Sequence, residues 1–137
     1  MCRRDQPATK TLSVWRYPNF LIIHLKRFIY IKKDDMGIMK VDNRVEFPLE
    51  GLDMTPYLAG PLQQGGEEFQ LYAKINHSGG PSGGHYTSYA AHPVTNTWHH
   101  FNDNKVTKEA PVSEKQNLAY VLFYKRTGCE FAMEETI

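Results

Sequence analysis

The chain has 137 residues, of which 41% are apolar and 12% aromatic, enough to pack one domain and too apolar for a disordered segment. Sixteen Lys and Arg residues face fifteen Asp and Glu residues, so the formal charge of +1 argues against a nucleic-acid partner. The longest apolar run, residues 118–124, is too short to span a bilayer, and two cysteines cannot build a disulfide framework. We therefore expect no membrane partner and a location in the cytoplasm or nucleus.

Most of the chain has the periodicity of β-strands. Residues 11–17 predict a first strand, and residues 20–25 predict a central one because they are apolar on both faces. Apolar and polar side chains alternate over residues 41–47 and 69–76, which is typical of strands with one buried face. Residues 118–124 are again apolar on both faces. The pattern predicts about seven strands, mostly antiparallel.

Helical signals are few and short. Thr55 followed by Pro56 is typical of an N-cap before a turn or two of helix. Ser113 and Gln116 have the spacing of a capping box. Loops are predicted between these elements, at residues 32–37, 60–66 and 78–84.

The glycine-rich loop at residues 78–84 is the most informative stretch. It has four glycines in seven residues, which lets the backbone take unusual conformations and lets another chain approach closely. The loop leads directly into His85, at the first position of a predicted strand over residues 85–91. A histidine fixed there suits a general base. The alternative is a flexible loop beside a histidine that only caps the strand.

The following hairpin brings an amide towards this histidine. With a turn centred between Pro93 and Val94, Asn102 lies opposite His85, where Cβ atoms are about 4.5–5.5 Å apart. An asparagine there can bond the imidazole and fix its tautomer, as a Cys/His/Asn protease site requires. Asp103 is expected to point to the other face of the sheet.

These motifs together resemble the ubiquitin-specific proteases. The matching segments follow the family's order from Cys2 to about Arg126: the signature strand Leu21–Phe28, residues 41–55, the histidine box Gly83–Thr87, the acid/amide box with Trp98 and Phe101–Asp103, and the final strand Ala119–Tyr124. The resemblance implies an α+β papain-like cysteine protease domain. This chain would be its mostly antiparallel β part, the end of the fingers and the palm, with few short helices.

The resemblance also implies roles for individual residues. His85 would be the general base, Asn102 the third member of the triad and Asp103 a polar neighbour. The family holds the Gly-Gly tail of ubiquitin in a groove closed by two mobile loops, here near residues 29–39 and 77–84. The residues implied to line this groove are Phe28, His77, Gly83, Gly84 and Tyr86.

The family's nucleophilic cysteine lies in a box far before the signature strand, and this chain has no such box. Cys129 follows the final strand and is interpreted as incidental. Cys2 has the spacing of the last zinc ligand of the family's fingers, but one cysteine cannot hold zinc, since a structural site needs four ligands. Structural zinc is thus expected only in a longer protein, and no organic cofactor is implied.

The leading interpretation is therefore the C-terminal part of a catalytic domain over residues 1–126, without the cysteine box, followed by a tail at 127–137. The reaction would be hydrolysis of the bond after the C-terminal glycine of ubiquitin, with ubiquitin or ubiquitinated proteins as partners. The chain alone is expected to be inactive. One alternative is a short chain that binds ubiquitin or another partner without catalysis. Another is a β-rich interaction module in which the glycine-histidine motif is coincidental.

Overall fold

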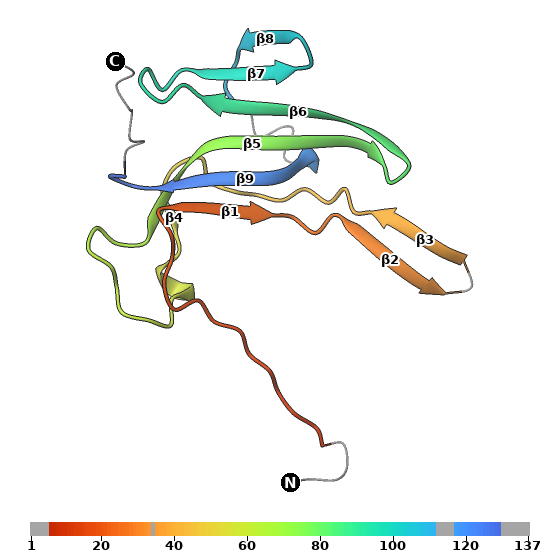
Figure 1. Cartoon of the computed structure of the whole chain (residues 1–137), viewed down its shortest axis with the longest axis horizontal. Coiled ribbons are helices and arrows are strands. Elements are labelled where there is room, and N and C mark those ends of the chain that lie inside the picture. Colours follow the sequence, from red (N-terminus) through yellow and green to blue (C-terminus); the bar gives the residue numbers. More distant parts are fainter. Residues whose placement is uncertain (1–5, 34, 112–116, 130–137) are drawn as a thin grey trace, which may run out of the picture.

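The structure is a computed structural model that describes residues 6–33, 35–111 and 117–129. The main sheet is antiparallel, in the order β1-β9-β5-β6-β7-β8, with β4 paired to β5 (Figure 1). A separate hairpin, β2–β3, extends beyond the end of β1 (Figure 1). The elements are β1 (Phe20–His24), β2 (Phe28–Lys33), β3 (Asp35–Lys40), β4 (Leu52–Asp53), the 3-10 helix η1 (Thr55–Tyr57), β5 (Glu68–Gly80), β6 (Gly83–Ala91), β7 (Trp98–Asn102), β8 (Lys105–Lys108) and β9 (Ala119–Arg126).

The core forms on one face of the central strands β5 and β9, as their apolar composition predicts. Leu71 on β5 lies opposite Tyr124 on β9, and both side chains are buried. Burial raises the pKa of Tyr124, whose hydroxyl donates a hydrogen bond to the carbonyl oxygen of Pro48 at 2.7 Å. The segment between β3 and β5 therefore covers this face, and its apolar side chains pack on the core: Phe47, Leu52, Met54 and Leu58.

The opposite face of the sheet is open in the described part of the chain. Ile22 on β1 is 61% exposed, although it lies opposite Phe123 of the central strand β9. Phe101 on β7 and Val106 on β8 are also exposed and lie opposite each other.

The described residues include no helix with the length and hydrophobicity of a membrane span.

The strands predicted at residues 20–25, 69–76 and 118–124 are confirmed, and so is the short helical turn that starts at Thr55. The central position predicted for residues 20–25 is wrong, because β1 lies at the edge of the main sheet and, among the described strands, pairs only with β9. The N-cap is Met54 rather than Thr55, which is the first residue of the turn.

The strand predicted at residues 11–17 is wrong. Residues 11–16 are an extended arm that leads away from the sheet (Figure 1), with an isolated bridge from Val14 to Leu58, while Tyr17 at the end of the arm is 4% exposed and packs in the core. Leu12 and Trp15 on the arm are 85% and 69% exposed, since no strand in the described part of the chain pairs with the arm along most of its length. The capping box at Ser113 lies outside the described residues.

Two other expectations are wrong: the strand at residues 41–47 and the loop at residues 32–37. Residues 41–47 alternate like a strand but form none, and the Arg27 side chain instead binds the carbonyl oxygens of Val41 and Asn43 at 2.8 and 3.0 Å. Residues 32–37, predicted as a loop, belong largely to the β2–β3 hairpin, which pairs as far as Lys33 with Asp35.

Strand pairing between β5 and β9 has two irregularities. Ile75 pairs with Val121 while the next residue, Asn76, pairs with Ala119, so Tyr120 is an extra residue on β9. A second shift leaves Tyr72 as the extra residue on β5. Such bulges re-aim side chains that would otherwise follow strict alternation.

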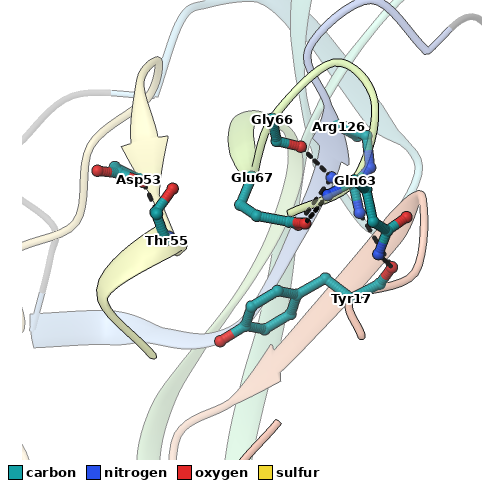
Figure 2. Close-up of polar contacts among 7 residues, drawn as sticks. All are labelled: Tyr17, Asp53, Thr55, Gln63, Gly66, Glu67 and Arg126. Atoms are coloured by element: carbon teal, nitrogen blue, oxygen red, sulfur yellow. Dashed lines mark hydrogen bonds and ion pairs between the residues drawn. The ribbon is translucent and has the colours of Figure 1, made fainter. Parts of the chain in front are cut away.

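A buried ion pair fastens the end of the sheet far from the glycine-rich turn. Arg126, at the end of β9, binds the carboxylate of Glu67 at 2.7 Å and the carbonyl oxygen of Tyr17 at 2.9 Å (Figure 2). Its guanidinium also binds the carbonyl oxygen of Gly66 and lies 5.1 Å from the ring centre of Phe69. One cation thus joins the last strand to the start of β5 and to the segment before β1.

Removing the Arg126 guanidinium should strongly destabilise the fold. Arg126→Met is expected to lower the free energy of unfolding by about 3–5 kcal/mol, because Glu67, only 1% exposed, would stay buried without its partner. The control is Arg44→Met, which breaks an exposed 3.8 Å pair with Glu46 and should cost less than about 1 kcal/mol. Urea unfolding of both variants checks this, and equal losses would contradict it.

Candidate functional site

The structure brings the ring of His85 to the side chain of Asn102. The Nε2 atom of His85 on β6 lies 2.6 Å from Oδ1 of Asn102 at the end of β7. The predicted contact is therefore present, but the predicted register is off by two residues. The strands pair Ser88 with Phe101, so the ladder continues with Thr87 opposite Asn102, and His85 is a diagonal neighbour.

The turn of the hairpin explains this difference. It runs from His92 to Thr97, with a hydrogen bond from the amide of His92 to the carbonyl oxygen of Thr97 at 2.9 Å. Asn96 has a positive φ of 52° there. The turn is thus centred later than predicted. A shift of two residues keeps every side chain on its own face, so the contact between His85 and Asn102 survives.

The amide sets which ring nitrogen can act as a base. Because Oδ1 of Asn102 can only accept a hydrogen bond, Nε2 of His85 carries the proton and donates it. Nδ1 of the neutral ring is then left with its lone pair. His85 is exposed, so a group on another segment can reach that nitrogen. The pair has the form of an oriented general base.

Asp103 lies apart from this pair. It occupies the turn between β7 and β8 with a positive φ of 50°, which is uncommon for a residue with a side chain. It lines an apolar hollow of about 360 Å³ with Tyr86 and Phe101. His85 and Asn102 instead line a hollow of about 180 Å³. Asn102 and Asp103 thus line different hollows. A catalytic role for Asp103 stays a prediction.

The glycine-rich segment is a tight hairpin rather than the loop predicted for residues 78–84. β5 continues to Gly80 and β6 starts at Gly83, so only Pro81 and Ser82 form the turn. A Cβ atom on Gly84 would lie 2.2 Å from Nε2 of His77. Glycine is therefore required at position 84, because the strand lies directly against the imidazole of His77.

His77 is the centre of an aromatic cluster. Its ring centre lies 4.7 Å from that of Tyr86, 5.4 Å from that of Phe28 and 5.9 Å from that of Tyr120. His77, Tyr86 and Phe28 were expected from the sequence. Tyr120 was not, because its position depends on the bulge in β9. These rings line a groove of about 520 Å³, called here the tail groove, together with residues of two hairpins: Tyr30, Ile38, Gly80, Pro81, Ser82, Gly83 and Gly84.

Electrostatics separate the two histidines. His77 is 3% exposed, and its buried Nδ1 atom has no hydrogen-bond partner among the described residues. Burial lowers the pKa of His77, and the ammonium group of Lys40 lowers it further. His77 is thus neutral at pH 7 and acts as a packed aromatic ring, while His85 is the histidine with an accessible nitrogen.

The thiol of Cys129 is not near His85. Thr127, two residues earlier, donates a hydrogen bond to Glu68 at the start of β5, whereas His85 pairs with Ser78 near the other end of that strand. Ten residues of strand separate those positions, or roughly 33 Å at ~3.3 Å per residue. Cys2 lies outside the described residues. Within those residues, no group of three or more His, Cys, Asp or Glu side chains is placed to hold a metal ion.

Sequence comparison places this geometry in a known context. Residues 2–124 match the family described as ubiquitin carboxyl-terminal hydrolase. Ubiquitin carboxyl-terminal hydrolase 9 of Arabidopsis thaliana is 40% identical over 129 residues, covering 94% of this chain and 14% of the relative. Ubiquitin carboxyl-terminal hydrolase 15 of Homo sapiens is 39% identical over 127 residues, covering 91% of this chain and 12% of the relative. The chain thus spans a small part of each relative.

Solved structures agree with the sequence comparison. A SAGA DUB module containing Ubp8 and bound to monoubiquitin superposes with a TM-score of 0.70 and 26% identity, covering 82% of this chain and 24% of that chain. A second module, bound to ubiquitin aldehyde, gives a TM-score of 0.69 and 25% identity, covering 82% of this chain and 25% of that chain.

The two adjacent glycines provide a direct test of the tail groove. Gly84→Ala should distort the packing around His77, because the new methyl group would also lie 2.5 Å from the carbonyl oxygen of Ser78. Gly83→Ala should be tolerated, since nothing lies within 4 Å of its added Cβ. NMR spectra of the His77 ring and melting temperatures would distinguish the variants. Equal effects at both positions would contradict the close approach.

Proposed function

This chain belongs to the ubiquitin carboxyl-terminal hydrolase family, and we propose that it supplies the histidine–asparagine half of a thiol-dependent deubiquitinase site. Its antiparallel sheet is the β part of the papain-like fold. The reaction is hydrolysis of the peptide or isopeptide bond after the C-terminal glycine of ubiquitin. The observation that carries the proposal is the 2.6 Å contact between His85 and Asn102, which leaves Nδ1 of the histidine as the base.

In the proposed mechanism, the nucleophilic cysteine lies outside this chain and faces Nδ1 of His85. The imidazole takes the thiol proton, and the thiolate attacks the carbonyl carbon of the terminal glycine. The protonated imidazole then gives its proton to the departing amine, and a thioester remains. Water, deprotonated by the same imidazole, hydrolyses the thioester and releases the thiol. Asn102 holds the ring in the required tautomer throughout.

The tail groove is the proposed site for the extended end of ubiquitin. A ubiquitin tail that ends in two glycines needs a narrow passage. Gly83 leaves open space where a side chain would lie, and Gly84 lets the wall of the groove pack against His77. Phe28 and Tyr86 provide flat apolar walls. The similar modules bound to monoubiquitin and ubiquitin aldehyde support ubiquitin as the ligand.

A second candidate function is ubiquitin binding without catalysis. It is favoured by the position of Cys129, which is at the opposite end of β5 from His85, so the described residues combine a groove and a base without a nearby thiol. In either case, we propose that residues 1–126 are part of a catalytic domain of this family, in line with the match over residues 2–124. Zinc would be structural, with Cys2 as one of several ligands from a longer protein. We place the protein in the cytoplasm or nucleus.

Hydrolysis of a ubiquitin–fluorophore conjugate tests the proposal. The chain alone should give no turnover, whereas the chain mixed with the cysteine-bearing half of a family catalytic domain should give turnover. His85→Gln should abolish that activity, because no base remains to take the thiol proton. Turnover by the chain alone that disappears on Cys129→Ser would overturn this assignment of roles.

Asn102 and Asp103 should respond differently in the same complemented assay. Asn102→Ala should lower kcat about 10²-fold or more, because the ring of His85 loses the acceptor that fixes its tautomer. Asn102→Asp should retain most of the activity, since a carboxylate oxygen accepts the same hydrogen bond. Asp103→Asn is the comparison variant and should lower kcat less than Asn102→Ala, because Asp103 lines a different hollow from His85. A larger loss at Asp103 than at Asn102 would contradict Asn102 as the orienting residue.

A further inference from the structure

The tail groove has two walls that the backbone does not join directly. One wall is the β2–β3 hairpin, which contributes Phe28, Tyr30 and Ile38. The other is the tight β5–β6 turn at residues 80–84. Among the described strands, β2 and β3 pair only with each other and form a sheet of their own. The width of the groove therefore depends on side chains that reach from one wall to the other.

Lys40 makes such a connection. It is the last residue of β3 and pairs with Phe28 at the root of the hairpin. Its Nζ atom donates a hydrogen bond to the carbonyl oxygen of His77 on β5 at 3.0 Å and lies 2.9 Å from the carboxylate of Asp42. The Lys40 side chain is only 5% exposed, whereas Asp42 is 59% exposed, so the contact with β5 is shielded from water.

The residue that Lys40 reaches is the one that organises the groove. The ring of His77 contacts Phe28 from the hairpin wall and Tyr86 from β6, and Gly84 packs directly against its Nε2 atom. A shift of the His77 backbone would move all three of these contacts together. A charge-assisted hydrogen bond in a shielded position is strong enough to oppose that shift.

We propose that Lys40 is a positioning residue that couples the hairpin wall of the tail groove to the glycine-rich wall and so sets its width for an extended peptide tail. This inference rests on the proposed function for the identity of that tail, as the end of ubiquitin. Lys40 acts through His77 and does not contact the reacting bond.

A separate anchor makes this role testable apart from folding. Arg27, 3% exposed, binds the carbonyl oxygens of Val41, Asn43 and Ala119 and fixes the root of the hairpin to β9. Loss of the Lys40 ammonium therefore leaves the hairpin attached to the sheet. The interaction that is lost is the hydrogen bond from Lys40 at the end of β3 to the carbonyl oxygen of His77.

Amide hydrogen exchange on the full chain measures the coupling without any ligand. Lys40→Met should speed exchange about tenfold in both walls, at residues 28–40 and 79–84, and leave residues 68–71 unchanged. Lys26→Met, which alters an exposed lysine just before the same hairpin, should change neither wall. Lys40→Arg should restore most of the protection. Faster exchange in the hairpin alone would overturn the proposal.

Two further measurements cover the other outcomes. If Lys40→Met does not fold, Asp42→Asn decides the question, because it removes the partner that orients the ammonium and should loosen both walls to a smaller extent. Titration with ubiquitin should show about tenfold weaker binding for Lys40→Met than for Lys26→Met. If ubiquitin binds neither form, the proposed function fails, while the exchange data still decide the coupling between the walls.

Discussion

Strand β5 must satisfy its hydrogen bonds along both edges, and the rest of the structure follows from that requirement. One edge pairs with β6 and carries the register that places His85 opposite Ser78. The other edge pairs with β9 and closes the core through Leu71 and Tyr124. Because both ladders share one backbone, the register of the core strand also determines where the base and the groove lie. The site is thus built from the same strand that stabilises the fold.

The interior strands and the base–amide pair could be predicted from the sequence for a common reason. An apolar run on both faces favours a central position, as β9 shows, although the equally apolar β1 lies at the edge of the sheet. The contact between His85 and Asn102 depends on which face each side chain occupies, and that parity survived a two-residue error in register. A one-residue error would have pointed Asp103 to the histidine. The face that a side chain occupies can therefore be predicted from the sequence more reliably than the exact register between two strands.

The features that the sequence did not reveal depend on partners distant in the chain. Residues 41–47 alternate like a strand, but the guanidinium of Arg27 takes up carbonyl oxygens that a neighbouring strand would have bound. The arm at Leu12 and Trp15 has the composition of a strand, but the residues that the structure describes provide it with no partner along most of its length. Tyr120 joins the groove through a bulge, which no local pattern marks. Composition identifies what a segment can form, while neighbours decide whether it forms.

The extra residue at Tyr120 has a consequence for how this chain can change in length during evolution. Deleting it would give a regular ladder in which Ala119, Leu122 and Tyr124 keep their shared buried face, because each could keep its present partner on β5. The deletion would instead remove the ring that lies 5.9 Å from His77 and lines the tail groove. A single-residue deletion there would therefore spare the core and damage the groove. The tip of the β2–β3 hairpin carries no such constraint, because β2 and β3 pair only with each other in the described structure. Insertions and deletions in related chains should accumulate at that tip and spare β9.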